Sequence, residues 1–419
     1  MNRLAIIGAG VAGLGLAYKL RHSFDLVLYE KDNRAGGHSH TVDIEEKDRI
    51  IPVDTGFMVF NQVTYPHLLQ LFKDLEVPIK KTDMSFSVQL KSDNLEYSGA
   101  SFDRLFGDRK NLFSPRFWKF LLEIDRFNKD GLKTEEDLFW SELSLKDYAT
   151  ARNYSQDLVN RYLIPMTGAL WSAPPEKMMA FPAITLLRFF RNHGLLATET
   201  HHQWWTVDGG ARVYVDKILK QLGDATRIGC GAVEVTRDSK AVRVKDATGE
   251  EREFDQVVFA CHADQALALL KNPREEEREI LSAFSYQRND TTVHTDSSVM
   301  PHHKRCWASW NYRLAHDGSS THYWMNSLQN VSDRENYFVS LNADHLIDQK
   351  KVLKRMVYHH PLFDVSALRA QQRLPELNRN SYKDQVFYCG SYFGFGFHED
   401  ALRSSIKLAE LLTGTRVCT

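Results

Sequence analysis

The sequence predicts an α/β fold: a parallel sheet flanked by helices, interrupted by an inserted domain of the α+β type. Three observations predict it. An apolar strand at residues 4–7 is followed by a glycine-rich turn, a helix-like run ending at Leu20 and a second apolar strand at residues 26–29. Later apolar runs at residues 256–260 and 386–388 have the length and flanking turns of buried parallel strands. The long segments between them have helical or alternating periodicity, as expected of an inserted domain.

The glycines of the first turn occupy the positions of a dinucleotide-binding fingerprint. Gly8 permits the tight turn, Gly10 lets the backbone approach a pyrophosphate, and Gly13 lets the helix pack close to the strand. The helix N-terminus presents free N–H groups and a partial positive charge to phosphates. Glu30 ends the second strand, where it can accept hydrogen bonds from a ribose. An ordinary glycine turn is the alternative, and it is disfavoured because all these parts occur together.

The segment after Glu30 favours FAD over NAD. It contains an Arg-x-Gly-Gly element at residues 34–37, where a plain NAD dehydrogenase usually continues as an ordinary helix. Further elements follow at residues 54–57, 205–210, 256–262 and 386–401. Together they resemble the flavin amine oxidase superfamily, which also includes protoporphyrinogen oxidase and the carotenoid desaturases.

The resemblance covers nearly the whole chain and narrows to a bacterial subfamily. This subfamily is described as predicted NAD/FAD-binding oxidoreductases. Its genes are often found near cyclopropane-fatty-acyl-phospholipid synthases, and some members are implicated in desaturating methyl-branched acyl chains. The similar segments are residues 36–42, 53–61, 95–99, 111–118, 181–183, 261–267 and 394–400.

The resemblance implies a Rossmann-like FAD domain of the glutathione-reductase type and an amine-oxidase-like substrate domain. The FAD domain is expected at residues 1–80, 205–270 and 376–419, and the substrate domain at residues 81–204 and 271–375. FAD is expected to be held non-covalently. The residues expected to bind it are Gly8, Gly10, Ala12, Gly13, Glu30, Lys31, Arg34, Gly36, Gly37, His38, Thr55, Gly56, Phe57, Val233 (through its backbone), Ala260, Gly390, Ser391, Phe397 and His398.

Local patterns predict further elements. Residues 212–222 are expected to form a helix, and residues 231–250 a β-meander. In the substrate domain residues 101–200 are expected to be mostly helical. The expected strands, which should form a mixed or antiparallel sheet, are residues 85–90, 293–299, 306–312, 322–326 and 337–341.

Composition excludes several classes of protein. The 53 Lys and Arg nearly cancel the 54 Asp and Glu, so no overall field attracts nucleic acid. The five cysteines are scattered, with no metal-binding spacing, which indicates reduced thiols in a cytoplasmic protein. Cys389 beside the flavin motif raises the alternative of covalent flavin, but a small core residue is favoured. The apolar N-terminus belongs to the first strand rather than to a signal peptide, and no apolar stretch is long enough for a membrane span.

A helical segment rich in aromatic and basic residues has two interpretations. Phe113, Phe117, Phe120, Leu121 and Ile124 share one helix face, with basic residues around them. A second apolar patch lies at residues 178–190. Both patches are expected to be mainly core. The alternative is an acyl-chain entrance docked peripherally on the inner face of an anionic membrane, which the acidic neighbours weaken. The basic residues are Arg104, Arg109, Lys110, Arg116, Lys119, Arg126 and Lys129; the acidic ones are Asp103, Asp108, Glu123 and Asp125.

The expected chemistry is hydride transfer from a C–H bond to flavin N5. Many amine oxidases hold a lysine near N5 on a strand of the substrate domain. The corresponding segment here, residues 292–299, has no lysine, and Lys304 is expected in a loop. The absence of this lysine favours a lipid-like, fatty acyl substrate. A flavin amine oxidase acting on a soluble amine and a non-catalytic flavin-binding redox or membrane-associated protein are the alternatives.

Several histidines occur within the motifs and are candidates for proton transfer. The resemblance places the N-terminus of the last helix at the flavin, so His398 with Glu399 is the first choice for a catalytic pair. His262 is the second choice. For each of them, and for His38 and His40, a purely structural hydrogen bond is the alternative. No metal ligands are expected.

Overall fold

The computed structural model describes residues 1–134, 140, 142–196, 202–238 and 241–414. At its base lies a five-stranded sheet whose neighbouring strands are all parallel. Its order is β10 (Thr226–Arg227), β2 (Asp25–Tyr29), β1 (Arg3–Ile7), β14 (Gln256–Phe259) and β20 (Val386–Tyr388). The central strands are apolar and almost wholly buried, which confirms the predicted α/β class.

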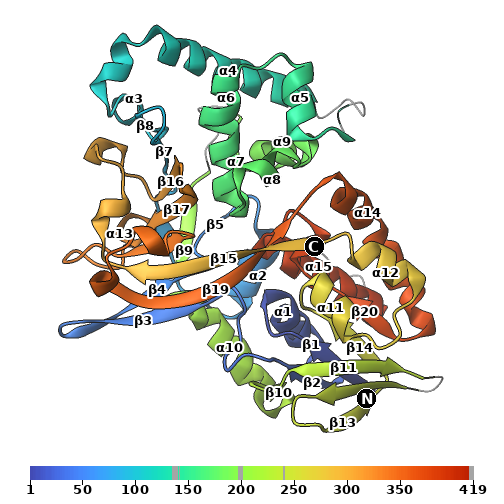
Figure 1. The fold of residues 1–419 in the computed structure, drawn as a ribbon. Coiled ribbons are helices and arrows are strands. Elements are labelled where there is room, and N and C mark those ends of the chain that lie inside the picture. Colours follow the sequence, from blue (N-terminus) through green and yellow to red (C-terminus); the bar gives the residue numbers. More distant parts are fainter. Residues whose placement is uncertain (135–139, 141, 197–201, 239–240, 415–419) are drawn as a thin grey trace.

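Helices and a meander complete this part of the molecule (Figure 1). Helix α1 (Val11–Leu20) packs against α15 (His398–Thr413) and α10 (Arg212–Leu222). The strands β11 (Ala232–Arg237), β12 (Val242–Asp246) and β13 (Glu251–Phe254) form the expected antiparallel meander. Three more helices pack in series: α11 (Ala263–Leu269) against β11, α12 (Glu275–Leu281) against α11, and α14 (Val365–Asn380) against α12 and β20.

The second sheet has seven strands and is mixed, as expected. Its order is β19-β15-β18-β17-β16-β7-β8, and only the β16–β7 pair is parallel. A short helix, α13 (Met325–Leu328), follows β17. The strands are β7 (Phe86–Leu90), β8 (Leu95–Ser98), β15 (Ser285–His294), β16 (Trp310–Ala315), β17 (Gly318–Trp324), β18 (Phe338–Leu341) and β19 (Val352–Leu362).

Three of the strand predictions were wrong in position. The strand expected at residues 322–326 is β17, which begins at Gly318 and ends at Trp324, where α13 follows. The strand expected at residues 293–299 begins at Ser285 and ends at His294, because Asp296 caps a 3-10 turn by accepting a hydrogen bond from the Ser298 N–H. The strand expected at residues 306–312 begins only at Trp310, after a 3-10 turn at Lys304–Cys306. At residues 297–299 and 304–306 a 3-10 turn, and at residues 325–328 a short helix, replaced what alternation alone suggested.

Residues 101–200 are mostly helical where described. Met178, Phe181, Leu186 and Phe190 are buried, so the second apolar patch is core. Between α6 and α7 lies one π-helical turn, Val159–Leu163. The helices are α3 (Phe102–Leu105), α4 (Pro115–Thr134), α5 (Leu145–Ala151), α6 (Gln156–Leu158), α7 (Ile164–Trp171), α8 (Pro175–Met179) and α9 (Ala183–Asn192).

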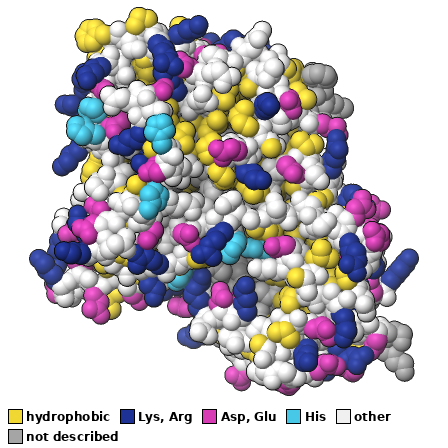
Figure 2. Space-filling view, in the orientation of Figure 1, with side chains coloured by type: hydrophobic (Ala, Val, Ile, Leu, Met, Phe, Trp, Pro, Cys, Tyr) yellow, Lys and Arg dark blue, Asp and Glu magenta, His cyan; other side chains and the backbone are white. Residues whose placement is uncertain are grey.

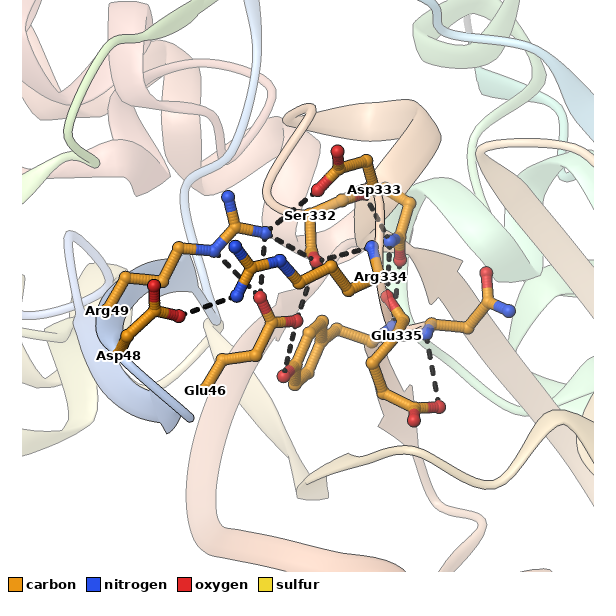
Figure 3. Close-up of polar contacts among 10 residues, drawn as sticks. Glu46, Asp48, Arg49, Ser332, Asp333, Arg334 and Glu335 are labelled. Atoms are coloured by element: carbon orange, nitrogen blue, oxygen red, sulfur yellow. Dashed lines mark hydrogen bonds and ion pairs between the residues drawn. The ribbon is translucent and has the colours of Figure 1, made fainter.

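Polar side chains attach a β-hairpin to the loop at residues 332–335 (Figure 3). Buried Glu46 accepts hydrogen bonds from Ser332 Oγ at 2.6 Å and Tyr337 Oη at 3.1 Å, while Arg49 Nε donates to it at 2.7 Å. These contacts attach the hairpin to the loop before β18 and so hold the flavin motif that follows the hairpin. The hairpin is β3 (Thr41–Glu46) and β4 (Arg49–Asp54); the adjacent small sheet is β5 (Phe60–Asn61), β9 (Trp204–Val207) and β6 (Ile79–Thr82), with α2 (Pro66–Asp74) between β5 and β6.

No helix in the described part of the chain is long and apolar enough to cross a membrane.

Candidate FAD site and active site

The first glycine loop leaves open space beside a helix N-terminus. A Cβ on Gly13 would lie 1.9 Å from the Gly8 carbonyl oxygen, and one on Gly8 would lie 2.8 Å from the Ala260 oxygen. A Cβ on Gly10, by contrast, would have no atom within 4 Å among its described neighbours. Gly10 is the N-cap of α1 and no side chain caps the helix, so the N–H groups around Ala12 face this space. The loop therefore fits a pyrophosphate.

Glu30 and the meander frame the adenosine end of the predicted site. The Glu30 carboxylate, 8 % exposed, accepts hydrogen bonds from the N–H groups of Ala9 at 2.8 Å and Asp32 at 2.9 Å. It retains lone pairs that a ribose can use. Exposed Lys31 packs against Gly231. Val233 sits in a bulge between Ala232 and Glu234, which leaves its backbone out of the strand register and suited to the predicted backbone contact.

The Arg-x-Gly-Gly element lies directly on the first loop. The Gly36 N–H donates to the Ala9 oxygen at 2.7 Å, and Gly36 also forms an isolated bridge with Gly10. Gly36 and Gly37 both have positive φ, +108° and +57°. Half-buried Arg34 precedes them. The two motifs therefore form one continuous surface, as the prediction requires.

The next motif runs alongside residues 38–40. The Phe57 N–H donates to the His38 oxygen at 2.7 Å, and the Thr55 N–H donates to the His40 oxygen at 2.9 Å. A Cβ on Gly56 would lie 2.3 Å from the His38 oxygen, so only glycine fits between these segments.

The Asp54 side chain holds the residue after the Gly209-Gly210 motif close to the hairpin. Its buried carboxylate accepts hydrogen bonds from the Ala211 N–H at 2.9 Å, Thr41 Oγ1 at 2.5 Å and Gln329 Nε2 at 2.6 Å. Burial raises the pKa of Asp54 to about 6. The carboxylate thus joins the start of α10, the hairpin and the end of α13. Gln329 could not be predicted, because it is 275 residues away in the sequence.

The C-terminal motif is folded by a second buried aspartate. Asp400 Oδ2 accepts from the Phe395 N–H at 2.9 Å and the Phe397 N–H at 3.1 Å, which shapes the loop before α15. Burial raises the pKa of Asp400 to about 6. At the start of the motif the Gly390 N–H donates to Ser404 Oγ at 2.9 Å, and Ser391 begins a 3-10 turn. Cys389 is fully buried, and burial raises its pKa.

His398 and Glu399 are neighbours whose side chains have different partners. His398 Nε2 hydrogen-bonds Ser39 Oγ at 2.8 Å and Tyr214 Oη at 3.1 Å, and the ring stacks on Phe57 at 3.9 Å. Burial, with a smaller effect of His38, lowers the pKa of His398 to about 3. Glu399 instead accepts from the His67 and Leu68 N–H groups, each at 3.0 Å, at the start of α2. The structure does not bring the two predicted catalytic side chains together as a pair.

A histidine cluster lies where β19 passes the Gly37–His38 segment. Rings of His38 and His360 are 5.2 Å apart, and His262 stacks on Tyr286 at 4.1 Å. Buried His38 Nε2 and His262 Nδ1 have no hydrogen-bond partner among the described residues. Burial lowers the pKa of His38 to about 4 and that of His262 to about 3. These neutral rings offer unpaired nitrogens to a bound group.

Sequence reasoning missed the members of this cluster that lie on β19. Tyr358 Oη hydrogen-bonds Thr55 Oγ1 at 2.6 Å and His40 Nδ1 at 2.8 Å. His360 Nδ1 contacts Asn289 Nδ2 at 2.9 Å. Tyr358 and His360 are two residues apart on one strand, so they share a face. That spacing was the available signal.

An aromatic wall lies next to His398 on the side of the helices. The Phe397 ring is 4.8 Å from Phe189 and 6.0 Å from Trp171, and Trp171 Nε1 donates to the Phe395 oxygen at 3.0 Å. We call Trp171, Phe189, Phe395 and Phe397 the aromatic wall. Trp171 and Phe189 come from the inserted helices. Trp171 was not singled out from the sequence, whereas Phe189 belongs to the apolar patch at residues 178–190, for which an acyl-chain entrance was the alternative interpretation.

The strand β15 carries no lysine. Its basic residues are Arg288, whose exposed side chain pairs with Asp290 at 2.8 Å, and buried His294. Asn289, fully buried, occupies the middle of the strand. Within the described residues no group of three His, Cys, Asp or Glu could hold a metal ion.

These features fit FAD. The protein provides open space at Gly10, a helix N-terminus without a side-chain cap, the displaced backbone of Val233 and two histidine nitrogens unpaired among the described residues. Glycines occur where a side chain would collide with the neighbouring backbone. The fold and the site define an FAD-dependent oxidoreductase.

The family model for flavin containing amine oxidoreductases matches residues 11–345. The chain belongs to this family. Among curated protein sequences none matches significantly.

Similar solved structures confirm the fold over the whole chain. Putrescine oxidase with bound putrescine has 14 % sequence identity and a TM-score of 0.73, covering 99 % of both chains. A fatty acid isomerase of P. acnes that produces CLA has 15 % identity and a TM-score of 0.71, also covering 99 % of both. Cyclohexylamine oxidase of Brevibacterium oxydans has 13 % identity and a TM-score of 0.69, covering 98 % of this chain and 99 % of its own.

Proposed function

We propose that the protein dehydrogenates a lipid-like substrate, a fatty acyl chain, using FAD as the hydride acceptor. The observation that carries the proposal is the aromatic wall beside His398. Phe395 and Phe397 are half-buried and are backed by buried Trp171 and Phe189, so they present an uncharged surface against which a hydrocarbon chain can lie.

The electrostatics of the neighbouring groups support an uncharged substrate segment. His38, His262 and His398 are held neutral because burial lowers their pKa values far below 7. The middle of β15 presents an amide, Asn289, rather than a cation or an anion. A protonated amine would find no carboxylate in the aromatic wall to pair with.

The bound flavin supplies the hydride acceptor, N5. Removing two hydrogens from adjacent carbons also requires a group that takes the second hydrogen as a proton. We assign that role to His398, which is neutral and whose Nε2 is oriented by Ser39 and Tyr214. His262 is the second choice, since its Nδ1 is unpaired among the described residues.

Amine oxidation is the second candidate, because putrescine oxidase and cyclohexylamine oxidase share the fold. It is favoured less here since β15 carries no lysine. The fatty acid isomerase shares the fold equally well, so the fold accommodates acyl substrates too.

Anaerobic stopped-flow absorbance tests the proposal. The FAD-loaded protein is mixed with fatty acids, acyl phospholipids in detergent, putrescine or cyclohexylamine, and flavin bleaching is followed. We expect an acyl substrate to bleach the flavin and the amines to leave it oxidised. Bleaching by an amine alone would overturn the acyl assignment. Mass spectrometry of lipids from cells with and without the protein then identifies the product.

A further inference from the structure

The surface formed by α3, α4 and the 3-10 turn between them exposes large apolar side chains. Phe113 is 86 % exposed, Leu122 71 %, Phe102 66 % and Trp118 41 %. We call this region, residues 102–122, the α3–α4 surface. Figure 2 shows hydrophobic and basic side chains gathered at the upper edge of the molecule, where Figure 1 places α3 and α4. Exposed aromatic side chains in one place, rather than scattered singly, mark an interaction site.

Two of the exposed side chains, Phe102 and Trp118, pack on the same buried ring, that of Phe106. The Phe102 ring lies 4.8 Å from Phe106, which lies 5.0 Å from Trp118. Trp118 Nε1 donates to the Leu112 oxygen at 2.9 Å, next to Phe113. Leu122 follows Trp118 by one helical turn on α4 and shares its face.

Packing of the hydrophobic core does not require the exposed apolar side chains of the α3–α4 surface. Phe117 and Phe120, on the other face of α4, are each 1 % exposed and pack with Phe106. The predicted helix face was thus wrong for one member: Phe113 lies before α4, which begins at Pro115, and its side chain points outward. Helix α4 is therefore apolar on the face that packs on the core and also carries apolar side chains on the face exposed to solvent.

The charge around the α3–α4 surface is strongly positive. Residues 101–129 and 302–305 contain nine Lys and Arg against four Asp and Glu, in a chain whose net charge is −1. Packing brings residues 302–305 beside α3, because Gly107 lies against Cys306. Arg109 pairs with Asp103 and Arg116 with Asp157, whereas no ion pair within the described residues involves Arg104, Lys110, Lys119, Lys304 or Arg305.

We infer that the α3–α4 surface docks on an anionic lipid bilayer. Phe102, Phe113, Trp118 and Leu122 enter the boundary between headgroups and acyl chains, and the cations without ion pairs contact the anionic headgroups. A second copy of the chain is a poorer occupant, since a two-fold interface would place the same excess of positive charge against itself. Docking of this kind is independent of which substrate the flavin oxidises.

Co-sedimentation of the FAD-loaded protein with vesicles tests the inference. Vesicles are pure phosphatidylcholine or phosphatidylcholine with phosphatidylglycerol, at low and high salt. One double variant, Phe113→Ser with Leu122→Ser, removes apolar side chains, and another, Lys110→Glu with Lys119→Glu, reverses charge. The matched control, Ile50→Ser with Lys407→Glu, changes exposed side chains on β4 and α15. Circular dichroism and bound FAD establish that every variant is folded.

We expect the wild type and the control to bind the anionic vesicles, more weakly at high salt. Each surface variant should lose binding by about tenfold or more. The inference would be overturned if the wild type did not sediment with the anionic vesicles at low salt. It would also be overturned if both surface variants bound these vesicles as strongly as the wild type does. A dimer in light scattering that Phe113→Ser dissociates, without vesicle binding, would assign the surface to a second copy instead.

Discussion

His398 is the residue on which the proposed chemistry depends most. Its side chain is oriented by Ser39 and Tyr214 and stacked on Phe57, so both its rotation and its hydration are restricted. Because burial lowers its pKa to about 3, the ring is neutral at physiological pH, so one of its two nitrogens carries a lone pair that can accept a proton from substrate.

We predict that His398→Ala keeps bound FAD but slows flavin reduction by substrate about 100-fold or more, the usual size of a general-base contribution. Tyr214→Phe is the matched control, because it removes one partner and keeps the ring. The measurement is the rate of anaerobic flavin bleaching together with the FAD content of the purified protein. Unchanged bleaching in His398→Ala would remove the residue from the mechanism.

Among residues, sequence patterns identified those whose chemistry is local. Gly8, Gly10 and Gly13 were recognised because a motif requires them at fixed spacing. Tyr358, His360 and Trp171 were not, since each reaches the site through pairing or packing with segments far away in the chain. Glu399 was chosen for its neighbour His398, but adjacent helical residues point in different directions, and its carboxylate caps α2 instead.

At the level of elements, the turn between β1 and α1 contains two glycines with different roles. Gly13 is required for packing, and Gly10 is expected to serve cofactor binding. A Cβ on Gly13 collides with the Gly8 carbonyl, whereas one on Gly10 meets open space. The backbone of Gly10, with φ of −73°, also suits an L-residue. The packing of the apoprotein therefore does not require a glycine at position 10.

Two substitutions in this loop should have opposite effects. Gly13→Ala is expected to destabilise the protein even without FAD, by about 3 kcal/mol or more, because backbone cannot give way. Gly10→Ala should leave the melting temperature of the apoprotein unchanged but weaken FAD binding about tenfold or more, or about 1.4 kcal/mol. Differential scanning fluorimetry and a flavin fluorescence titration measure the two effects.

Each of these two predictions has an outcome that would contradict it. If Gly10→Ala binds FAD as the wild type does, the pyrophosphate does not lie against Gly10. If Gly13→Ala melts at the wild-type temperature, the close contact with Gly8 does not hold α1 in place.

Across the whole molecule, six histidines that are buried or half-buried have lowered pKa values and are neutral at physiological pH. Burial lowers the pKa values of the group to about 3 or 4. In the unfolded chain these side chains have an ordinary pKa near 6.5, so below that pH the unfolded state binds more protons. The group is His38, His193, His262, His294, His322 and His398.

The free energy of unfolding should therefore fall as the pH is lowered from about 7 to 5. Each such histidine contributes a loss of about 2 kcal/mol at pH 5. Asp54 and Asp400 act in the opposite direction, because their pKa values are raised to about 6, but they are fewer. Urea unfolding with saturating FAD at the two pH values measures the difference.

The histidine chain in the second sheet provides the matched variant. His322 is fully buried and hydrogen-bonds Ser340 Oγ at 2.8 Å, whereas His22 is exposed. His322→Gln should flatten the pH dependence and His22→Gln should not. If the free energy of unfolding of the wild type is the same at pH 5 and pH 7, folding does not lower the pKa values of these histidines.

The sequence by itself determined the α/β class, the glycine cradle and FAD, because these depend on residues close together in the chain and on steric demands that few side chains meet. It did not determine where β15 ends, that Phe113 lies before α4 with an exposed side chain, or which side chains surround His398. Those were decided by tertiary structure, since burial and hydrogen-bond partners come from segments hundreds of residues apart, as Asp54 and Gln329 do.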